Sequence, residues 1–363
     1  AAGAAAAAAA SPLRDAARCP YAGLRNVGAT CYVNSLLQYL FVNTALRRRI
    51  LEAQAGGDKI LGALQLLFGR MQQGRESVCD PTEFVDSSGL ARGEQEDVTE
   101  LWQLLMAYLS NRTHGAVQKL VSFSQTFRVE CLACRGISER TELLCELRVS
   151  LQSSRGGARG GASELEAELA ATLAVEELSG ENRYACEGCG CLQDAHRNKA
   201  LRNLPALLHI VLDRYHWDAA SGERRKICQA VSYPEVLDLS RFLDRGDASA
   251  AQKTLAAPAC DAGGSTFRLI GVLEHHSGTA DSGHYTATLR RPAPDGAGGP
   301  PSPWWCFNDS RVSRAAAPGE EVPPAGDAPA GRRWTSRSAY MLAYTRLGAA
   351  GAGEPGGASG AAD

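Results

Sequence analysis

The chain has 363 residues, of which 44% are hydrophobic and 21% charged, and its formal net charge is −2 at pH 7. This length suits one large domain or two ordinary ones, and the composition suits a soluble globular protein. The near-neutral balance argues against a nucleic-acid or anionic-membrane partner, and no run approaches the roughly 18 apolar residues that a membrane span needs. We expect a monomer without either partner.

The two ends of the chain have low complexity. Residues 1–20 start with an alanine-rich stretch that lacks the features of a secretory signal, and residues 347–363 are rich in Gly and Ala. We expect both ends to be disordered. Twelve cysteines in a large chain without an export signal indicate the reduced thiols of the nucleus or cytoplasm, some of them used for metal binding or catalysis.

Helical periodicity dominates the first third of the chain. Apolar residues recur at helical spacing in "CYVNSLLQYLFVNTALRRRIL", "LGALQLLFGRMQQG" and "EDVTELWQLLMAYL". We therefore expect a helical unit from about Tyr21 to Leu109.

Strand-like patterns dominate from about Phe123 onward. "FSQTFRVECLAC" and "CELRVSLQ" alternate, and five later segments are rich in β-formers: "ALLHIVLDRYHW", "TFRLIGVLEHH", "GHYTATLRR", "WWCFND" and "SAYMLAYTRL". One helix is expected in "SELEAELAATLAVEEL", and flexible insertions or loops at 153–163, 292–303 and 315–331. Helices followed by strands indicate the α+β class.

Two Cys-x-x-Cys pairs are candidate metal ligands. Cys131 and Cys134 form the first pair, and Cys186 and Cys189 the second. Two such knuckles complete the four-sulfur tetrahedron that structural zinc prefers, provided that the fold brings them together. We therefore expect a structural Zn²⁺ and no catalytic cofactor. Buried thiols without metal are the alternative, and the neighbouring Cys191 leaves the choice of ligands slightly open.

Cys31 precedes a helical run, so it is expected at a helix N-terminus with Thr30 as the cap. Unpaired N–H groups there favour a thiolate and lower the pKa of the thiol. A base is expected in His284 of "SGHYTA", which starts a strand, and an orienting group in Asn308 or Asp309 of "WCFNDS". Each residue alone has an ordinary explanation in packing or turn formation. Their order Cys…His…Asn strengthens the catalytic interpretation.

Five blocks of the sequence resemble the ubiquitin-specific proteases, a family of deubiquitinating cysteine peptidases. "GLRNVGATCYVNSLLQ" is similar to the cysteine box of that family, and "LIGVLEHHSGTADSGHYTATLR" to its histidine box. "WWCFNDSRV" and "AYMLAYTR" resemble its closing strands. "LPALLHIVLDRY" resembles its Leu-Pro…Leu-x-Arg-Phe block, with Tyr215 in place of Phe. The paired Cys-x-x-Cys motifs match its zinc-holding fingers.

The resemblance implies roles for five residues around the thiol. Cys31 is similar to the nucleophile of the family, His284 to its general base and Asn308 to its orienting residue. Asp309 is a second candidate for that orienting role. Asn26 resembles the side-chain donor of the oxyanion hole. The implied reaction is hydrolysis of the bond after the C-terminal Gly of ubiquitin, through a thioester.

The resemblance also implies how a ubiquitin tail is held. "GEQEDVTELW" is similar to a block whose acidic residues bind arginines of the tail, and Asp97 and Glu100 occupy those positions. Gly283 and Tyr285, on either side of the base, are expected to line a narrow channel for the Gly-Gly end. A solvated acidic helix face is the alternative explanation for Asp97 and Glu100.

The implied architecture is papain-like and resembles a right hand. A catalytic domain is expected at 21–346, with a helical thumb at about 21–115, zinc-bearing β fingers at about 120–200 and a β palm at about 201–346. Within the family, "VNTALRRRI" and "ENRYACEGCG" are most similar to the nuclear, histone-type subfamily numbered 48 and its plant counterparts. The expected partners are ubiquitin and ubiquitylated proteins. A catalytically weak ubiquitin-binding scaffold and a protease for another ubiquitin-like modifier are the alternatives.

Overall fold

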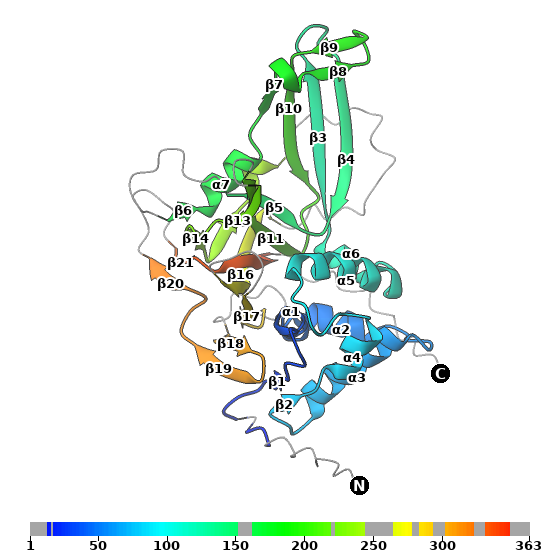
Figure 1. The fold of residues 1–363 in the computed structure, drawn as a ribbon, viewed down its shortest axis with the longest axis vertical. Helices are drawn as coiled ribbons and strands as arrows, with labels where there is room; N and C mark the ends of the chain where they lie inside the picture. The colour runs from blue at the N-terminus through cyan, green and yellow to red at the C-terminus, as the bar shows by residue number, and fades with distance from the viewer. Residues whose placement is uncertain are drawn as a thin grey trace, which may run out of the picture.

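The helices form one unit near the start of the chain. A computed structural model describes residues 13–15, 17–151, 162–218, 222–243, 264–277, 283–292, 302–322 and 331–348. The helices of the thumb are α1 (Cys31–Val42), α2 (Thr44–Glu52), α3 (Lys59–Gln73), α4 (Thr82–Ser87), α5 (Val98–Arg112) and α6 (Ala116–Val121). A short parallel pair, β1 (Gly23–Leu24) and β2 (Val78–Cys79), lies beside them. Figure 1 shows α1 at the centre of the molecule, between the other helices and the strands.

The first predicted helical run is divided in two at Asn43. This residue has an extended backbone, and its side chain accepts a hydrogen bond from Leu46 N, so it caps α2. All twelve residues of α1 are buried, whereas α2 buries Leu46 and Ile50 on one side. A helix that is buried all round belongs to the interior of a domain, which explains why most residues of α1 are apolar.

The fingers are a long sheet that projects away from the helices (Figure 1). Four antiparallel strands in the order β4-β3-β10-β7 build it: β3 (Phe123–Cys131), β4 (Ile137–Leu144), β7 (Glu176–Leu178) and β10 (Ala195–Arg202). At its far end lies a hairpin of β8 (Tyr184–Cys186) and β9 (Cys191–Gln193), after the 3-10 turn η1 (Gly180–Asn182).

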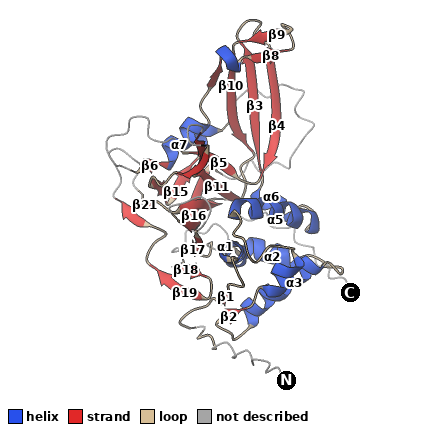
Figure 2. Ribbon diagram, viewed as in Figure 1, coloured by secondary structure: helices blue, strands red, loops and turns tan. Residues whose placement is uncertain are grey.

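The palm is built around an eight-stranded sheet. Seven strands follow the order β19-β18-β17-β16-β22-β11-β5, and β15 pairs with β16. Their bounds are β5 (Leu147–Ser150), β11 (Leu207–Asp213), β15 (Val236–Asp238), β16 (Thr266–His276), β17 (His284–Leu289), β18 (Trp304–Asn308), β19 (Arg311–Ala315) and β22 (Ala339–Arg346). Figure 2 shows β16, β17, β18 and β19 to the left of the helical unit, with the fingers above.

Smaller elements complete the palm. A four-stranded sheet has the order β20-β21-β14-β6, and β12 and β13 form a separate hairpin. These strands are β6 (Ser163–Glu164), β12 (Tyr215–Asp218), β13 (Glu223–Lys226), β14 (Val231–Pro234), β20 (Glu320–Val322) and β21 (Arg333–Ser336), and η2 (Ser240–Phe242) is a 3-10 turn.

The helix predicted in "SELEAELAATLAVEEL" is shorter than its pattern. Helix α7 spans Leu165–Thr172, while the residues before and after it form β6 and β7. Both α7 and β5 fall within 120–200, the range expected for the fingers, but β5 pairs in parallel with β11 of the large sheet and α7 packs against β5 and β14. The chain therefore passes through the palm between its two visits to the fingers.

Both faces of the large sheet are buried, each in a different apolar cluster. Along β22, Met341 and Ala343 pack with α1 and the other thumb helices, and Leu342 and Tyr344 pack with α7 and the smaller sheet. Successive side chains of a strand point to opposite faces, so this alternation places the thumb on one side of the sheet and α7 on the other.

The segregated helices and strands confirm the α+β class, and the helical unit, projecting sheet and large sheet confirm the expected thumb, fingers and palm. Of the insertions predicted at 153–163, 292–303 and 315–331, residues 153–161, 293–301 and 323–330 lie outside the described residues, as do most residues of the two low-complexity ends. Strand β20 occupies part of the third range, which was expected to be a loop throughout. None of the helices in the described ranges has the length and apolar character needed to cross a membrane.

A buried arginine ties the palm strands together. Arg214 is fully buried and donates hydrogen bonds to four backbone carbonyls: its Nε to Ala339 O, its Nη1 to Ile227 O and Gln229 O, and its Nη2 to Ser336 O. Burial lowers the pKa of this guanidinium to about 10, so it remains charged at neutral pH. The contacts connect the end of β11 with β22 and with the segment after β13.

We predict that Arg214→Met lowers the free energy of unfolding by at least about 3 kcal/mol, because buried carbonyls lose charged donors. Urea unfolding followed by circular dichroism measures this effect. The exposed Arg70 on α3 offers a matched control, and Arg70→Met should change stability by no more than about 0.5 kcal/mol. Equal effects of the two substitutions would show that the carbonyl contacts of Arg214 do not stabilise the fold.

Candidate functional site

Cys31 lies at the point where α1 meets the palm. It is the first residue of the helix, and 4% of it is exposed. Thr30 stands in the cap position, but its side chain does not cap the helix. Its hydroxyl donates to Asn26 Oδ1 at 3.1 Å and accepts from Val27 N at 3.1 Å. The prediction of a Thr30 side-chain cap was therefore wrong, because the loop before the helix uses that hydroxyl.

The sulfur of Cys31 accepts two N–H groups from different parts of the chain. Tyr285 N, in β17, donates to Sγ at 3.4 Å, and Gln95 Nε2 donates at 3.5 Å. Burial nevertheless raises the pKa of the Cys31 thiol, and the negative charge of Asp309 adds to this rise, whereas the Tyr285 N–H opposes it. The N–H groups of Cys31 and Tyr32 at the helix terminus do lower this pKa, as expected, but loss of water around the sulfur has the larger effect, so the net shift of the pKa is upward.

His284 starts β17, directly before the residue whose N–H contacts the sulfur. Its Nε2 lies 2.7 Å from Asn308 Oδ1, at the end of the adjacent strand β18. Because a carbonyl oxygen only accepts, Nε2 carries the ring proton and Nδ1 is the atom left to take another. Among the described residues, the thiol and the ring share no hydrogen bond; contacts of this kind often tighten only when substrate binds.

Asp309 contacts two asparagines instead of the His284 ring. Its Oδ2 accepts from Asn26 Nδ2 at 2.9 Å, and its Oδ1 accepts from Asn34 Nδ2 at 2.8 Å. Asp309 has φ of 49°, a left-handed conformation that Asp tolerates better than most residues. Its position therefore depends on the turn after β18, and its carboxylate orients the loop before Cys31.

Asn26 is held from both ends of its amide. Its Oδ1 accepts from Gly28 N at 3.2 Å and from Thr30 N at 3.3 Å, while its Nδ2 donates to Asp309. An amide nitrogen carries two N–H groups, so one donor of Asn26 is left for a ligand next to Cys31. Gly28 has φ of 142°, and a Cβ there would lie 2.1 Å from Arg92 O, so only glycine fits this loop.

Gln95 and Asn34 are the residues that sequence analysis missed. Gln95 bridges the cleft, because its Nε2 donates to Cys31 Sγ and its Oε1 accepts from Gly283 N at 3.0 Å. Gln95 lies within the family-like block "GEQEDVTELW", but only the acidic residues of that block were assigned a role. Asn34 had a visible signal: it is a polar residue one turn after Cys31 in an otherwise apolar run, and only 1% of it is exposed.

Of the four residues predicted to hold a peptide tail, Gly283 and Tyr285 contact Gln95 and Cys31, and Asp97 and Glu100 lie at the start of α5. Asp97 caps α5 through Thr99 N at 2.8 Å, and its other oxygen accepts from the hydroxyl of Tyr340 in β22. Tyr285 is buried, and its ring meets that of Tyr340 edge to face at 6.1 Å. Glu100 is exposed in the first turn of α5. Both oxygens of Asp97 are thus engaged within the chain.

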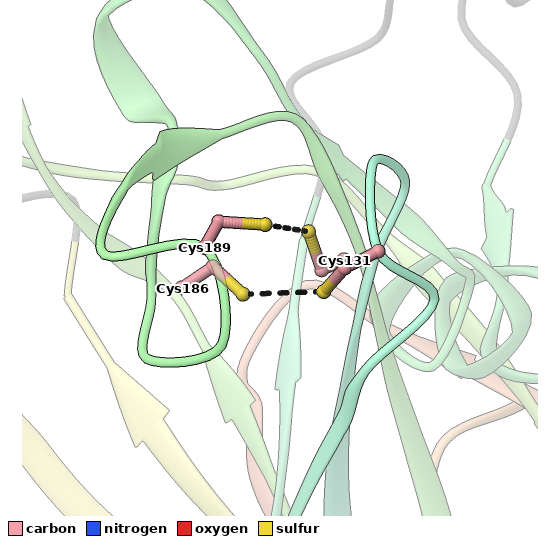
Figure 3. Close-up of side chains that lie close together, drawn as sticks. Cys131, Cys186 and Cys189 are labelled. Atoms are coloured by element: carbon pink, nitrogen blue, oxygen red, sulfur yellow. Dashed lines mark hydrogen bonds between the residues drawn. The ribbon is translucent and has the colours of Figure 1, made fainter.

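The four cysteines of the two knuckles converge at the far end of the fingers (Figure 3). Their sulfurs all lie within 4.8 Å of one another. Cys131 Sγ is 3.9 Å from Cys189 Sγ, and Cys134 Sγ is 3.6 Å from Cys186 Sγ. A tetrahedron with metal–sulfur bonds of 2.3 Å separates its sulfurs by about 3.8 Å, so the arrangement fits a Cys₄ zinc site. Cys191 lies outside this set.

Comparison with known proteins gives the family. The family model described as "Ubiquitin carboxyl-terminal hydrolase" matches residues 22–344. Ubiquitin carboxyl-terminal hydrolase 48 of Danio rerio is 30% identical over 356 residues, which are 89% of this chain and 31% of that protein. Ubiquitin carboxyl-terminal hydrolase 26 of Oryza sativa subsp. japonica is 31% identical over 316 residues, 83% of this chain and 26% of that protein.

A third relative is Ubiquitin carboxyl-terminal hydrolase 15 of Saccharomyces cerevisiae, 30% identical over 306 residues, 81% of this chain and 23% of that protein. The chain therefore spans less than a third of the length of these relatives. The likeness to the proteins numbered 48 and to plant relatives agrees with the resemblance found in the sequence. With a family model that matches nearly all of its described core, the chain belongs to the ubiquitin carboxyl-terminal hydrolase family.

Proposed function

We propose that this chain is a deubiquitinase that hydrolyses the isopeptide or peptide bond after the C-terminal Gly of ubiquitin. The observation that carries the proposal is the convergence at Cys31: the N–H next to His284 donates to its sulfur, and His284 bonds Asn308 at 2.7 Å. Three residues far apart in the sequence thus meet in one cleft between thumb and palm. Family membership supplies the substrate class.

In the first half of the reaction, His284 Nδ1 takes the proton of Cys31, and the sulfur attacks the carbonyl carbon of the terminal Gly. Negative charge develops on the carbonyl oxygen, where the second N–H of Asn26 and the backbone N–H of Cys31 stabilise it. His284 then gives its proton to the leaving lysine amine, the C–N bond breaks, and a thioester remains on Cys31. Asn308 keeps the ring in the required tautomer throughout.

In the second half, water attacks the thioester. His284 accepts a proton from that water, the same oxyanion contacts stabilise the new tetrahedral intermediate, and the C–S bond breaks. The products are the free carboxylate of ubiquitin and the restored thiol. Because burial raises the pKa of Cys31, the base is needed to generate the nucleophile and not only to protonate the leaving group.

The role proposed for Asp309 is to orient Asn26. Its carboxylate is bonded to the amides of Asn26 and Asn34 and to no ring nitrogen of the described residues. Asn308 therefore keeps the role of orienting His284, and Asp309 acts on the oxyanion side of the reaction.

The tail of ubiquitin is proposed to lie between Cys31 and Gly283. Gly283 and Tyr285 form one wall, and Asp97 and Glu100 face the arginines that precede the Gly-Gly end. Asp97 already caps α5 and accepts from the Tyr340 hydroxyl, whereas Glu100 is exposed. The carboxylate of Glu100 is therefore more available to bind an arginine of the tail.

We also propose that the Cys₄ cluster holds a structural Zn²⁺. The hairpin of β8 and β9 buries few apolar side chains, so four metal–sulfur bonds would replace a hydrophobic core there. None of the eleven cysteines in the described residues forms a disulfide. Free thiols in this number support a reducing compartment, the nucleus or the cytoplasm, as the proposed location.

The central prediction concerns covalent labelling. Ubiquitin that carries an electrophile in place of its terminal carboxyl should form an adduct with Cys31, located by mass spectrometry. Cys31→Ala should abolish the adduct and hydrolysis of a ubiquitin C-terminal reporter but keep ubiquitin binding, and Cys228→Ser, at an exposed thiol, should leave labelling unchanged.

Other outcomes of that experiment separate the alternatives. A chain that binds ubiquitin without forming the adduct is a scaffold. Faster labelling by the electrophile of another ubiquitin-like modifier would change the substrate. Turnover by Cys31→Ala would refute the nucleophile.

A second prediction concerns Asn26 and Asp309. Asn26→Ala should lower kcat about 10²- to 10³-fold, because a transition-state donor is lost. If Asp309 acts through Asn26, Asp309→Ala lowers kcat as well, and the double variant loses about as much as Asn26→Ala alone. Steady-state hydrolysis of the reporter measures these values. Losses that multiply in the double variant would show that the two residues act independently.

A third prediction concerns the metal. Purified protein should contain about one zinc ion per chain by mass spectrometry of the elements, since a Cys₄ site binds a single ion. Cys134→Ser should lower both the zinc content and the melting temperature. Cys191→Ser is the matched control at the adjacent exposed thiol and should keep both values. A metal-free wild-type protein with an unchanged melting temperature after chelation would contradict the zinc site.

A further inference from the structure

Lys226, the last residue of β13, has three acceptors around its ammonium group. Its Nζ lies 2.8 Å from Ser277 O, 2.9 Å from His275 O and 3.1 Å from His275 Nδ1. These acceptors belong to the end of β16 and the residue that follows it. An ammonium has three N–H donors, so the hydrogen-bonding capacity of Lys226 is filled by this segment.

His275 is a second histidine near the proposed base, and its neighbours define its protonation. Its Nδ1 receives the Tyr215 hydroxyl at 2.9 Å as well as the Lys226 ammonium. An ammonium cannot accept, so Nδ1 is the unprotonated acceptor and Nε2 carries the ring proton. Burial, with the charge of Lys226 next to it, lowers the pKa of His275 to about 4, so the ring is neutral at physiological pH.

The ring of His275 supports the residues on both sides of His284. It stacks on the ring of Tyr285 with 4.4 Å between centroids and 25° between planes. On the other side it touches Gly283 so closely that a Cβ there would lie 2.2 Å from His275 Nε2. Gly283 N is bonded to Gln95 and Tyr285 N to Cys31 Sγ. The His275 ring therefore contacts both Gly283 and Tyr285, whose backbone N–H groups donate to Gln95 and Cys31 of the thumb.

We propose that Lys226 and His275 form a positioning unit for the proposed catalytic base. The hairpin of β12 and β13 supplies Tyr215 and Lys226, these two groups fix the His275 ring, and the ring fixes Gly283 and Tyr285 on either side of His284 (β16 and β17 are labelled in Figure 1). Neither residue touches the reacting atoms. The inference rests on the proposed function, because it assigns these residues to the reaction of Cys31 and His284.

Lys226→Met tests the unit, since it keeps most of the side-chain stem and removes the charged donor. We expect kcat for a ubiquitin C-terminal reporter to fall about 10- to 100-fold, as small displacements of a catalytic group can cost up to about 10²-fold in rate. KM and the melting temperature should stay near the wild-type values. Lys119→Met, at an exposed lysine on α6, is the matched control and should leave kcat unchanged.

A pair of substitutions at His275 separates positioning from simple packing. His275→Asn keeps an oxygen acceptor near the place of Nδ1, whereas His275→Leu fills the space without an acceptor. Asn can accept from Lys226 and Tyr215 but lacks the ring that stacks on Tyr285. We therefore expect His275→Asn to retain more of kcat than His275→Leu, and His275→Leu to lose at least as much as Lys226→Met. If Lys226→Met fails to fold, this pair of His275 variants still tests the positioning role. Equal kcat values for Asn and Leu would overturn the proposal.

The affinity for ubiquitin is the third measurement that tests the positioning role of Lys226. In a Cys31→Ala background, Lys226→Met should bind ubiquitin as tightly as Cys31→Ala alone, because the unit acts on the base. A matching loss of affinity would place Lys226 in substrate binding and refute the positioning role. If the wild-type chain itself is not labelled at Cys31 by electrophilic ubiquitin, the proposed function fails; if it is labelled and Lys226→Met keeps wild-type kcat, only this inference fails.

Discussion

The packing of α1 against β17 is the contact on which the site depends. Every residue of α1 is buried, and its first residue receives the backbone N–H of Tyr285 on its sulfur at 3.4 Å. The apolar residues of the helix and the alternating residues of the sheet thus fix the distance between the thiol and the strand that starts with His284. Any shift of the thumb relative to the palm changes that distance. The packing that stabilises this interface therefore also fixes the geometry of the site.

A cost of this arrangement is the number of polar groups that it buries. Asn34, Gln38 and His209 are almost fully buried. Asn34 bonds Asp309 and His209 bonds the hydroxyl of Tyr39 across the interface, while Gln38 bonds the carbonyl of Ala22 within the thumb. Buried polar groups are tolerated when they are hydrogen-bonded, and the bonds then select one relative position of the packed elements. Apolar packing brings the thumb and palm together, and these directional contacts set their register.

The sequence allowed the elements to be predicted more completely than their assembly. Helical spacing located α1, α3 and α5, enrichment in β-formers located β16, β17 and β22, and the two Cys-x-x-Cys pairs located the cysteine cluster. These are local signals. The division at Asn43 and the place of α7 against the large sheet depend on tertiary contacts, which no local pattern contains.

The same limit applies to the site. Motif resemblance pointed to Cys31, His284 and Asn308, but it gave no means of choosing between Asn308 and Asp309, which are adjacent in sequence. The structure separates their contacts at the turn after β18, where the strand ends with Asn308 bonded to His284 and Asp309 enters the left-handed region and bonds Asn26. Gln95 was not found because its two partners, Cys31 and Gly283, are each more than 60 residues away in the chain.

Gln95 and Asp97 are hydrogen-bonded within the protein before any substrate enters, and this affects how much each of them can contribute to substrate binding. Gln95 uses both ends of its amide on the two sides of the cleft, and Asp97 uses both carboxylate oxygens within the protein. A peptide backbone that enters between Cys31 and Gly283 exchanges these bonds for its own. Because a hydrogen bond contributes only about 0.5–1.5 kcal/mol net, such an exchange is close to neutral. Under the proposed function, affinity must then come mainly from surfaces beyond the tail, and the cleft contributes where charge develops, at Asn26 and His284.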